Sequence, residues 1–167
     1  MSSDDPQTTH EAPSNDEPAV HPILLVDDHT FFRAGTRRIL EDQPDFRVVG
    51  EAGSGAEALD LLERCDPEVM VLDVNLPEMG GIAVCEAVRK ARPALSIVIL
   101  TGHNGEALMR ALNKLGVRGY FLKSTNPEEF IAGLRKVCQG ERAFCKEAQG
   151  VIDTAKTDDD LLSPREL

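Results

Sequence analysis

Five polar side chains that could together bind a phosphoryl group each lie at the end of a short apolar run. These residues are Asp27, Asp28, Asp73, Thr101 and Lys123. Three carboxylates held close together repel one another, and a hard divalent cation with a preference for oxygen ligands, such as Mg²⁺, relieves that repulsion. A carboxylate can also act as a nucleophile and form an aspartyl phosphate. With an ammonium and a hydroxyl group beside the acids, the set supplies the positioning and charge neutralisation that phosphoryl transfer needs.

The apolar runs before these residues are typical of buried strands, and segments with helical periodicity separate them. Strands are predicted over 23–26, 47–49, 69–72, 96–100 and 119–122, and helices over 30–42, 56–64, 82–91, 105–115 and 126–139. Strands that alternate with helices of about ten residues imply an α/β fold, with a parallel sheet covered on both faces. Right-handed crossovers place all the strand carboxyl ends at one edge, where we expect the five polar side chains to meet. Phe31 and Phe32, in the first helix, are predicted to belong to the core.

Most of the net charge of −11 lies at the two ends of the chain. Residues 1–21 contain five acids and no Lys or Arg, residues 151–167 carry a net −3, and residues 22–150 carry the remaining −3. Residues 1–21 are also poor in apolar side chains, so we expect them to form a disordered tail. Without a basic stripe to neutralise phosphates, the chain itself is a poor candidate for binding nucleic acid.

The cysteines and the hydrophobic pattern exclude other classes of protein. Four cysteines lie far apart without a C-x-x-C pair, which favours reduced thiols and indicates no zinc or redox role. His10, His21 and His29 show no metal-ligand spacing along the chain. No run approaches the roughly 18 apolar residues of a membrane span, and the polar start is not a secretory signal. We therefore expect a cytoplasmic protein without a membrane partner.

Four segments of the chain resemble the receiver domain of two-component response regulators. They are ILLVDDH (23–29), VMVLDVNLPEMGG (69–81), IVILTGH (97–103) and GVRGYFLKS (116–124). Finer motifs, FRAG (32–35) and VGEA (49–52), resemble the NarL/FixJ subfamily, and LLSPREL (161–167) resembles the start of a LuxR-type helix-turn-helix domain. The resemblance implies a flavodoxin-like, doubly wound (βα)5 fold with five parallel strands in the order 2-1-3-4-5.

The same resemblance implies a division of the chain. Residues 22–140 would form the receiver domain, 141–160 an interdomain linker, and 161–167 the first residues of a truncated DNA-binding domain. DNA contact would then occur only through the missing C-terminal domain of a longer transcriptional regulator.

The resemblance also implies which residues bind the metal and the phosphoryl group. Asp73 would accept the phosphoryl group from a sensor histidine kinase. Asp28 and Asp73 would bind Mg²⁺ directly, together with the main-chain carbonyl of Asn75, and Asp27 would act largely through water. Lys123 would pair with the phosphate.

Two further residues would turn phosphorylation into a conformational signal. Thr101 would hydrogen-bond to the phosphate, and Tyr120 would turn inward behind it, which would alter homodimer or interdomain contacts. The domain would thus be a phosphorylated switch that assists only its own phosphorylation and dephosphorylation, and not an enzyme with a separate substrate.

Residues 53–58 also fit a different class of protein, a dinucleotide-binding βαβ unit. They match G-x-G-x-x-A, and Asp73 lies 20 residues beyond Gly53, near the spacing of a ribose-binding acid. This interpretation leaves the acid pair, the threonine and the lysine without a role.

Two more hypotheses keep the aspartyl phosphate. A phosphatase of the haloacid dehalogenase type needs a second Asp two residues after the nucleophile, where this chain has Asn75. A stand-alone receiver that serves as a phosphate sink or interaction module would have no DNA output, and the LLSPREL segment argues against it.

Overall fold

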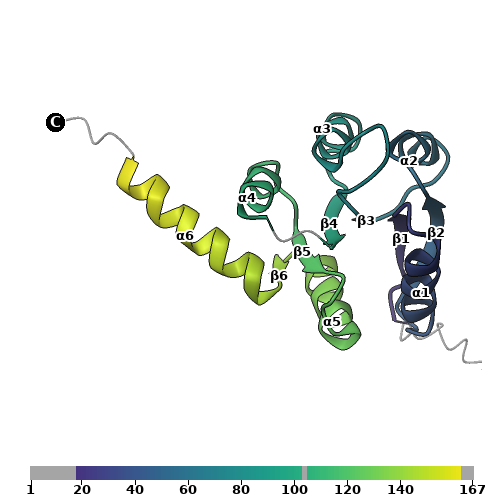
Figure 1. Ribbon diagram of the computed structural model, residues 1–167. Helices are drawn as coiled ribbons and strands as arrows, with labels where there is room; N and C mark the ends of the chain where they lie inside the picture. Colours follow the sequence, from purple (N-terminus) through teal and green to yellow (C-terminus); the bar gives the residue numbers. More distant parts are fainter. Residues whose placement is uncertain (1–17, 103–104, 163–167) are drawn as a thin grey trace, which may run out of the picture.

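Six parallel strands form the central sheet, in the order β2-β1-β3-β4-β5-β6 (Figure 1). The structure, a computed structural model, describes residues 18–102 and 105–162. The strands are β1 (His21–Val26), β2 (Phe46–Ala52), β3 (Val69–Leu72), β4 (Ser96–Thr101), β5 (Gly119–Leu122) and β6 (Ala143–Phe144). The first five confirm the predicted parallel α/β fold and the order 2-1-3-4-5.

Helices cover both faces of this sheet. They are α1 (Thr30–Glu41), α2 (Gly55–Leu62), α3 (Gly81–Ala91), α4 (Glu106–Lys114), α5 (Pro127–Cys138) and α6 (Lys146–Leu162). Helices α1 and α5 lie on one face, and α2, α3 and α4 lie on the other (Figure 1). The inner strands β1, β3 and β4 are therefore buried from both sides. This explains why their sequences are continuous apolar runs rather than alternating ones.

The edge strand β6 and the helix α6 occupy most of segment 141–160, which the sequence analysis predicts as a linker. Strand β6 extends the sheet beyond β5, with Gly119 paired to Ala143 and Tyr120 to Phe144. Helix α6 then contacts α4, and its first turns bury Ala148 and Ile152. A two-residue strand is too short to show a hydrophobic period. It forms because it pairs with the backbone groups at the edge of β5.

Next to the edge strand β2, β1 begins inside the segment predicted to be disordered. The backbone N–H of His21 donates to the carbonyl of Asp45 at 2.8 Å, and His21 pairs with Phe46 of β2. Residues 1–17 of the predicted tail, and residues 163–167 of the predicted DNA-binding segment, lie outside the described residues.

The first helix corrects one prediction about the core. Phe31 is 95% exposed, so its assignment to the core is wrong, whereas Phe32 packs partly buried against the core. Successive helix residues point about 100° apart. The inward face of α1 carries Phe32, Thr36 and Leu40 at a spacing of four residues, which turns Phe31 outward.

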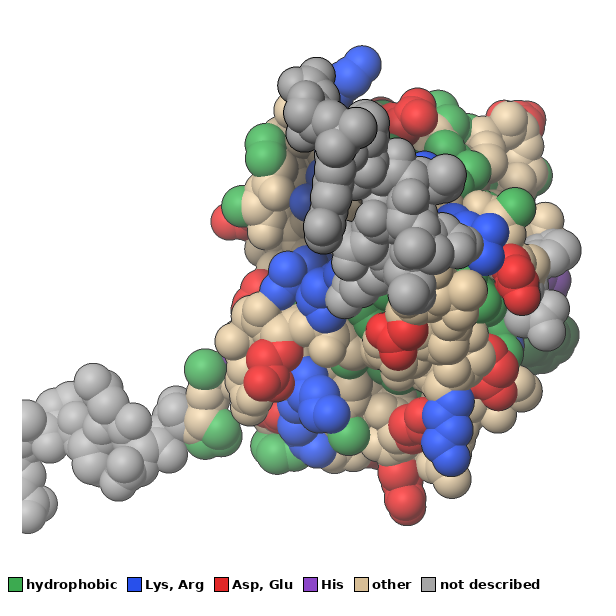
Figure 2. Space-filling model, turned by 90° about the vertical axis from the view of Figure 1, so that its left-hand side faces the viewer, with side chains coloured by type: hydrophobic (Ala, Val, Ile, Leu, Met, Phe, Trp, Pro, Cys, Tyr) green, Lys and Arg blue, Asp and Glu red, His purple; other side chains and the backbone are tan. Residues whose placement is uncertain are grey.

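Charged side chains of both signs are interspersed on the face of the molecule that includes α4 and α6. Figure 2 shows Lys and Arg among Asp and Glu there, with hydrophobic side chains scattered between them. The described residues on this face therefore form no continuous basic stripe.

Candidate functional site

The structure brings the predicted polar residues together at the carboxyl edge of the sheet. Asp27 and Asp73 directly follow β1 and β3, Thr101 ends β4, and Lys123 directly follows β5. Asp27, Asp73 and Thr101 are all buried. Since these strands are parallel neighbours, their ends lie side by side, and side chains far apart in the sequence reach one another.

Lys123 is the cation at the centre of this group. Its Nζ lies 2.8 Å from Oδ2 of Asp73 and 3.0 Å from Oδ2 of Asp27. It also lies 4.6 Å from the centre of the Phe32 ring, a cation–π distance. Burial lowers the pKa of Lys123, but its hydrogen bonds with Asp73 and Asp27 outweigh burial, and the pKa lies above its usual 10.5.

Both carboxylate oxygens of Asp73 have partners in the site. Oδ2 faces Lys123, while Oδ1 accepts hydrogen bonds from Oγ1 of Thr101 at 2.9 Å and from the backbone N–H of Asn75 at 3.0 Å. Burial alone raises the pKa of Asp73, yet the hydrogen bonds from Lys123, Asn75 and Thr101 bring it below the usual 3.8. The buried carboxyl group is therefore ionised at neutral pH.

This lowered pKa predicts how stability depends on pH. A carboxyl group whose pKa is lower in the folded state stabilises the protein above its unfolded pKa, and that contribution disappears as the pH falls through the folded pKa. We expect the stability of the unaltered protein, relative to an Asp73→Asn variant, to decrease as the pH falls from neutrality to below 3.8. Urea unfolding of both proteins across this pH range measures the difference in their free energies of unfolding. A difference that stays constant with pH would contradict the prediction.

Asp28 and His29 complete an acidic group of possible metal ligands. Candidate ligand atoms of Asp27, Asp28, His29 and Asp73 all lie within 4.8 Å of one another. The three carboxylates are the oxygen donors that Mg²⁺ prefers, so the donor set fits a hard divalent cation. Asn75 lines the same cleft of about 740 Å³, which opens beside Asp73 and Lys123.

His29 also lies in this site, although no site role was predicted for it from the sequence. Nδ1 of His29 lies 3.2 Å from both Asp27 and Asp28, and 3.1 Å from Nζ of Lys123. Its backbone N–H also donates to Oδ1 of Asp27 at 2.8 Å, which fixes the turn between β1 and α1. Its position directly after the acid pair was the only available signal.

Tyr120 is buried within the sheet, on the strand that precedes Lys123. Burial raises the pKa of its hydroxyl to about 12, with smaller contributions from Cys145 and Asp73. Its carbonyl accepts a hydrogen bond from the backbone N–H of Cys145 at 2.9 Å. The residue thus lies between the acidic site and the segment that leads into α6.

Comparison with protein families matches residues 23–135 to the family described as "Response regulator receiver domain". The nitrate/nitrite response regulator protein NarL of Escherichia coli is 34% identical over 161 residues, which cover 92% of this chain and 74% of NarL. NarP of the same organism is 38% identical over 122 residues, 73% of this chain and 57% of NarP.

Solved structures of response regulators are also similar to this chain. A LuxR-family response regulator from Aurantimonas sp. SI85-9A1 has a TM-score of 0.78 and 33% identity, over 83% of this chain and 99% of that one. The isolated receiver domain of RcsB from Salmonella enterica, solved with the phosphomimetic BeF3-, has a TM-score of 0.75 and 25% identity, over 79% of this chain and 98% of that one.

None of the helices in the described residues is long and apolar enough to span a membrane.

Proposed function

This chain belongs to the family of response regulator receiver domains, in its NarL- and LuxR-type branch of transcriptional regulators, and from this we propose that Asp73 accepts a phosphoryl group from a sensor histidine kinase. The observation that carries the proposal is the environment of Asp73. Its buried carboxylate is ionised, is oriented by Thr101 and Asn75, and lies 2.8 Å from a lysine ammonium at the edge of a cleft. The family assignment disfavours the dinucleotide-binding hypothesis.

A divalent cation fits the same site. We propose that Asp28, Asp73 and the main-chain carbonyl of Asn75 would hold Mg²⁺, with Asp27 acting largely through water. Bound there, the ion would neutralise charge on the acids and on the incoming phosphoryl oxygens.

The residues of the chain carry the rest of the transfer. An oxygen of Asp73 attacks the phosphorus atom carried by the phosphorylated histidine of the kinase, as the phosphorus–nitrogen bond of that histidine breaks. The imidazole of the kinase leaves with the electron pair of the broken bond. Lys123 compensates the negative charge that passes onto the acceptor, and His29 contributes to the wall of the cleft. We propose that hydrolysis of the aspartyl phosphate regenerates the acceptor, so that the domain acts as a switch and not on a separate substrate.

Two residues are suited to convert phosphorylation of Asp73 into a conformational change. The hydroxyl of Thr101 now donates to Asp73, and we propose that it donates to the phosphate once that forms. Tyr120 is already buried in this structure, so we propose that it keeps this inward position behind Thr101 rather than turning inward. Since the carbonyl of Tyr120 bonds to Cys145, a shift of β5 would reach α6 and, through it, α4.

The proposed output is transcriptional. The matched RcsB structures include two RcsB dimers bound to two parallel DNAs. We propose that this chain forms homodimers in a phosphorylation-dependent way, that residues 22–140 form its receiver, and that 141–160 link it to a DNA-binding domain beginning at 161–167. A phosphate sink without DNA output is the second candidate.

The test is the intact mass of the protein after incubation with acetyl phosphate and Mg²⁺. We expect a gain of one phosphoryl group that requires Mg²⁺ and is lost in Asp73→Asn. Asp60→Asn, at an exposed position of α2, serves as the matched control and retains the gain. No gain, together with no conformational response to beryllofluoride, would refute the proposal.

A further inference from the structure

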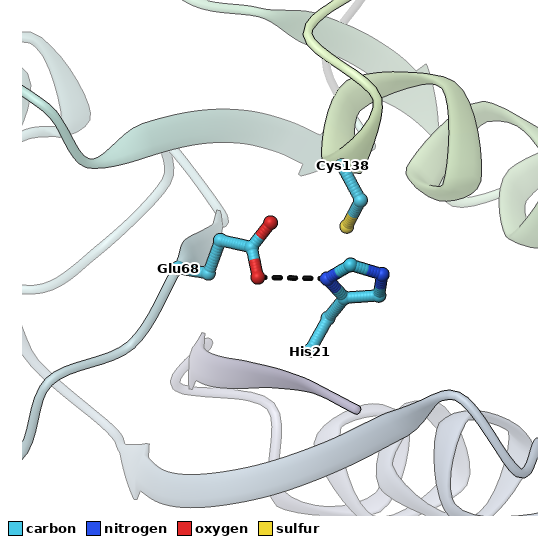
Figure 3. A group of neighbouring side chains, drawn as sticks. All are labelled: His21, Glu68 and Cys138. Carbon is cyan, nitrogen blue, oxygen red and sulfur yellow. Dashed lines mark hydrogen bonds and ion pairs between the residues drawn. The ribbon is translucent and has the colours of Figure 1, made fainter. Parts of the chain in front are cut away.

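A second cluster of possible metal ligands lies at the opposite edge of the sheet (Figure 3). His21 begins β1, Glu68 directly precedes β3, and Cys138 ends α5. Nδ1 of His21 is 2.7 Å from Oε2 of Glu68, and the candidate ligand atoms of all three residues lie within 4.8 Å of one another. The six residues of β1 separate this cluster from the acidic site, a distance of about 20 Å along an extended strand.

We propose that His21, Glu68 and Cys138 together bind one thiophilic divalent cation of the zinc class. Imidazole nitrogen, carboxylate oxygen and thiolate sulfur are the donors that Zn²⁺ uses in proteins, and three such ligands leave a fourth position for water. A thiolate is a poor ligand for Mg²⁺, so the two clusters select different ions.

The geometry requires only small movements. With bonds of about 2.0–2.3 Å in a tetrahedral arrangement, the ligand atoms of a zinc site lie about 3.3–3.6 Å apart. That spacing falls between the 2.7 Å of the His21–Glu68 pair and the 4.8 Å limit of the whole group. His21 and Cys138 are partly buried and the side chain of Glu68 is 42% exposed, so rotation of these side chains can reach that spacing.

The charges also balance. One carboxylate and one thiolate neutralise a divalent cation, and His21 binds as the neutral imidazole. The thiol of Cys138 loses its proton to the buffer as the sulfur–metal bond forms, and the ion replaces the hydrogen bond between His21 and Glu68.

Such an ion would tie together three elements that are distant in the sequence. It would link the start of β1, the start of β3 and the carboxyl end of α5. Because the unfolded chain does not hold these ligands together, binding stabilises the folded state. The ligands come from three separate elements, which explains why spacing along the chain gave no sign of a site.

Cobalt is a direct probe, because Co²⁺ replaces Zn²⁺ and a cobalt–thiolate bond absorbs in the near ultraviolet. We expect Co²⁺, added to the reduced protein in excess Mg²⁺, to produce this charge-transfer band at one equivalent, and Zn²⁺ to abolish it. Cys138→Ser should lose the band, whereas Cys65→Ser, at another partly buried free cysteine, should keep it. Glu68→Gln should weaken cobalt binding at least tenfold.

A second measurement, of stability against urea, does not depend on the absorption band. Zinc should raise the urea midpoint of the unaltered protein clearly more than that of Cys138→Ser, which keeps only the acidic site, while both proteins unfold cooperatively in EDTA. Asp73→Asn should keep the full cobalt band, which separates this site from the acidic one and from the proposed phosphorylation. Absence of the band, or a band that survives Cys138→Ser, would overturn the assignment.

Discussion

Replacement of Lys123 by Met is expected to destabilise the metal-free protein by about 3 kcal/mol, because it leaves two buried carboxylates without their cation. Asp27 and Asp73 both pair with its Nζ, and their side chains are only 10% and 1% exposed. Without the ammonium the pKa of Asp73 rises, since burial is then opposed only by its hydrogen bonds with Asn75 and Thr101.

Mg²⁺ should partly reverse this loss. A divalent cation beside the acids supplies the positive charge that the variant lacks, so Mg²⁺ should stabilise Lys123→Met more than the unaltered protein. Urea unfolding in EDTA and in Mg²⁺ measures both effects. Lys90→Met, at an exposed position of α3, is the matched control, with an expected change below about 1 kcal/mol. Equal midpoints for Lys123→Met and the unaltered protein in EDTA would show that the ammonium does not balance these acids.

The second large effect is expected at Gly81, the first residue of α3. A Cβ atom at this position would lie 2.4 Å from Cα and 2.6 Å from Cβ of Val74. The backbone of Val74 cannot rotate away, and the N–H of Gly81 donates to its carbonyl at 3.0 Å. The glycine is therefore required for the close approach of α3 to the residue that directly follows Asp73.

Gly81→Ala should separate α3 from the loop after β3, with a loss of stability of about 2–3 kcal/mol. The same displacement would move Asp73, so we also expect slower phosphorylation by acetyl phosphate. The neighbouring Gly80 has open space around its Cβ position and a φ of −66°, so Gly80→Ala is a matched control. Unfolding midpoints and initial phosphorylation rates measure the two effects. If Gly81→Ala matched Gly80→Ala in both, the close contact would have no consequence.

Both predictions concern features that the sequence indicates only in part. Lys123 was predicted as a site residue because it follows an apolar run, and in a parallel α/β fold every strand end comes to one edge. Residues 80–81 lie outside the predicted strands and helices, and the sequence gives no sign of their contact with Val74, since close approach to Val74 is a property of the folded backbone.

The sequence by itself determined the parallel α/β fold and the residues at the carboxyl edge, whereas the strand order was implied by the resemblance to receiver domains. Continuous apolar runs predicted buried strands, and topology then placed Asp27, Asp73, Thr101 and Lys123 together. These inferences succeed because they depend on local periodicity and on a general rule of chain connection, which hold whatever the details of side-chain packing.

Tertiary structure decided the rest, because the remaining features arise from contacts between distant segments. Strand β6 forms only against the edge of β5, and the exposure of Phe31 follows from which side of α1 meets the sheet. The cluster of His21, Glu68 and Cys138 joins residues 47 and 70 positions apart in the chain. No local sequence pattern predicts this cluster, since its residues come into contact only once β1, β3 and α5 have packed together.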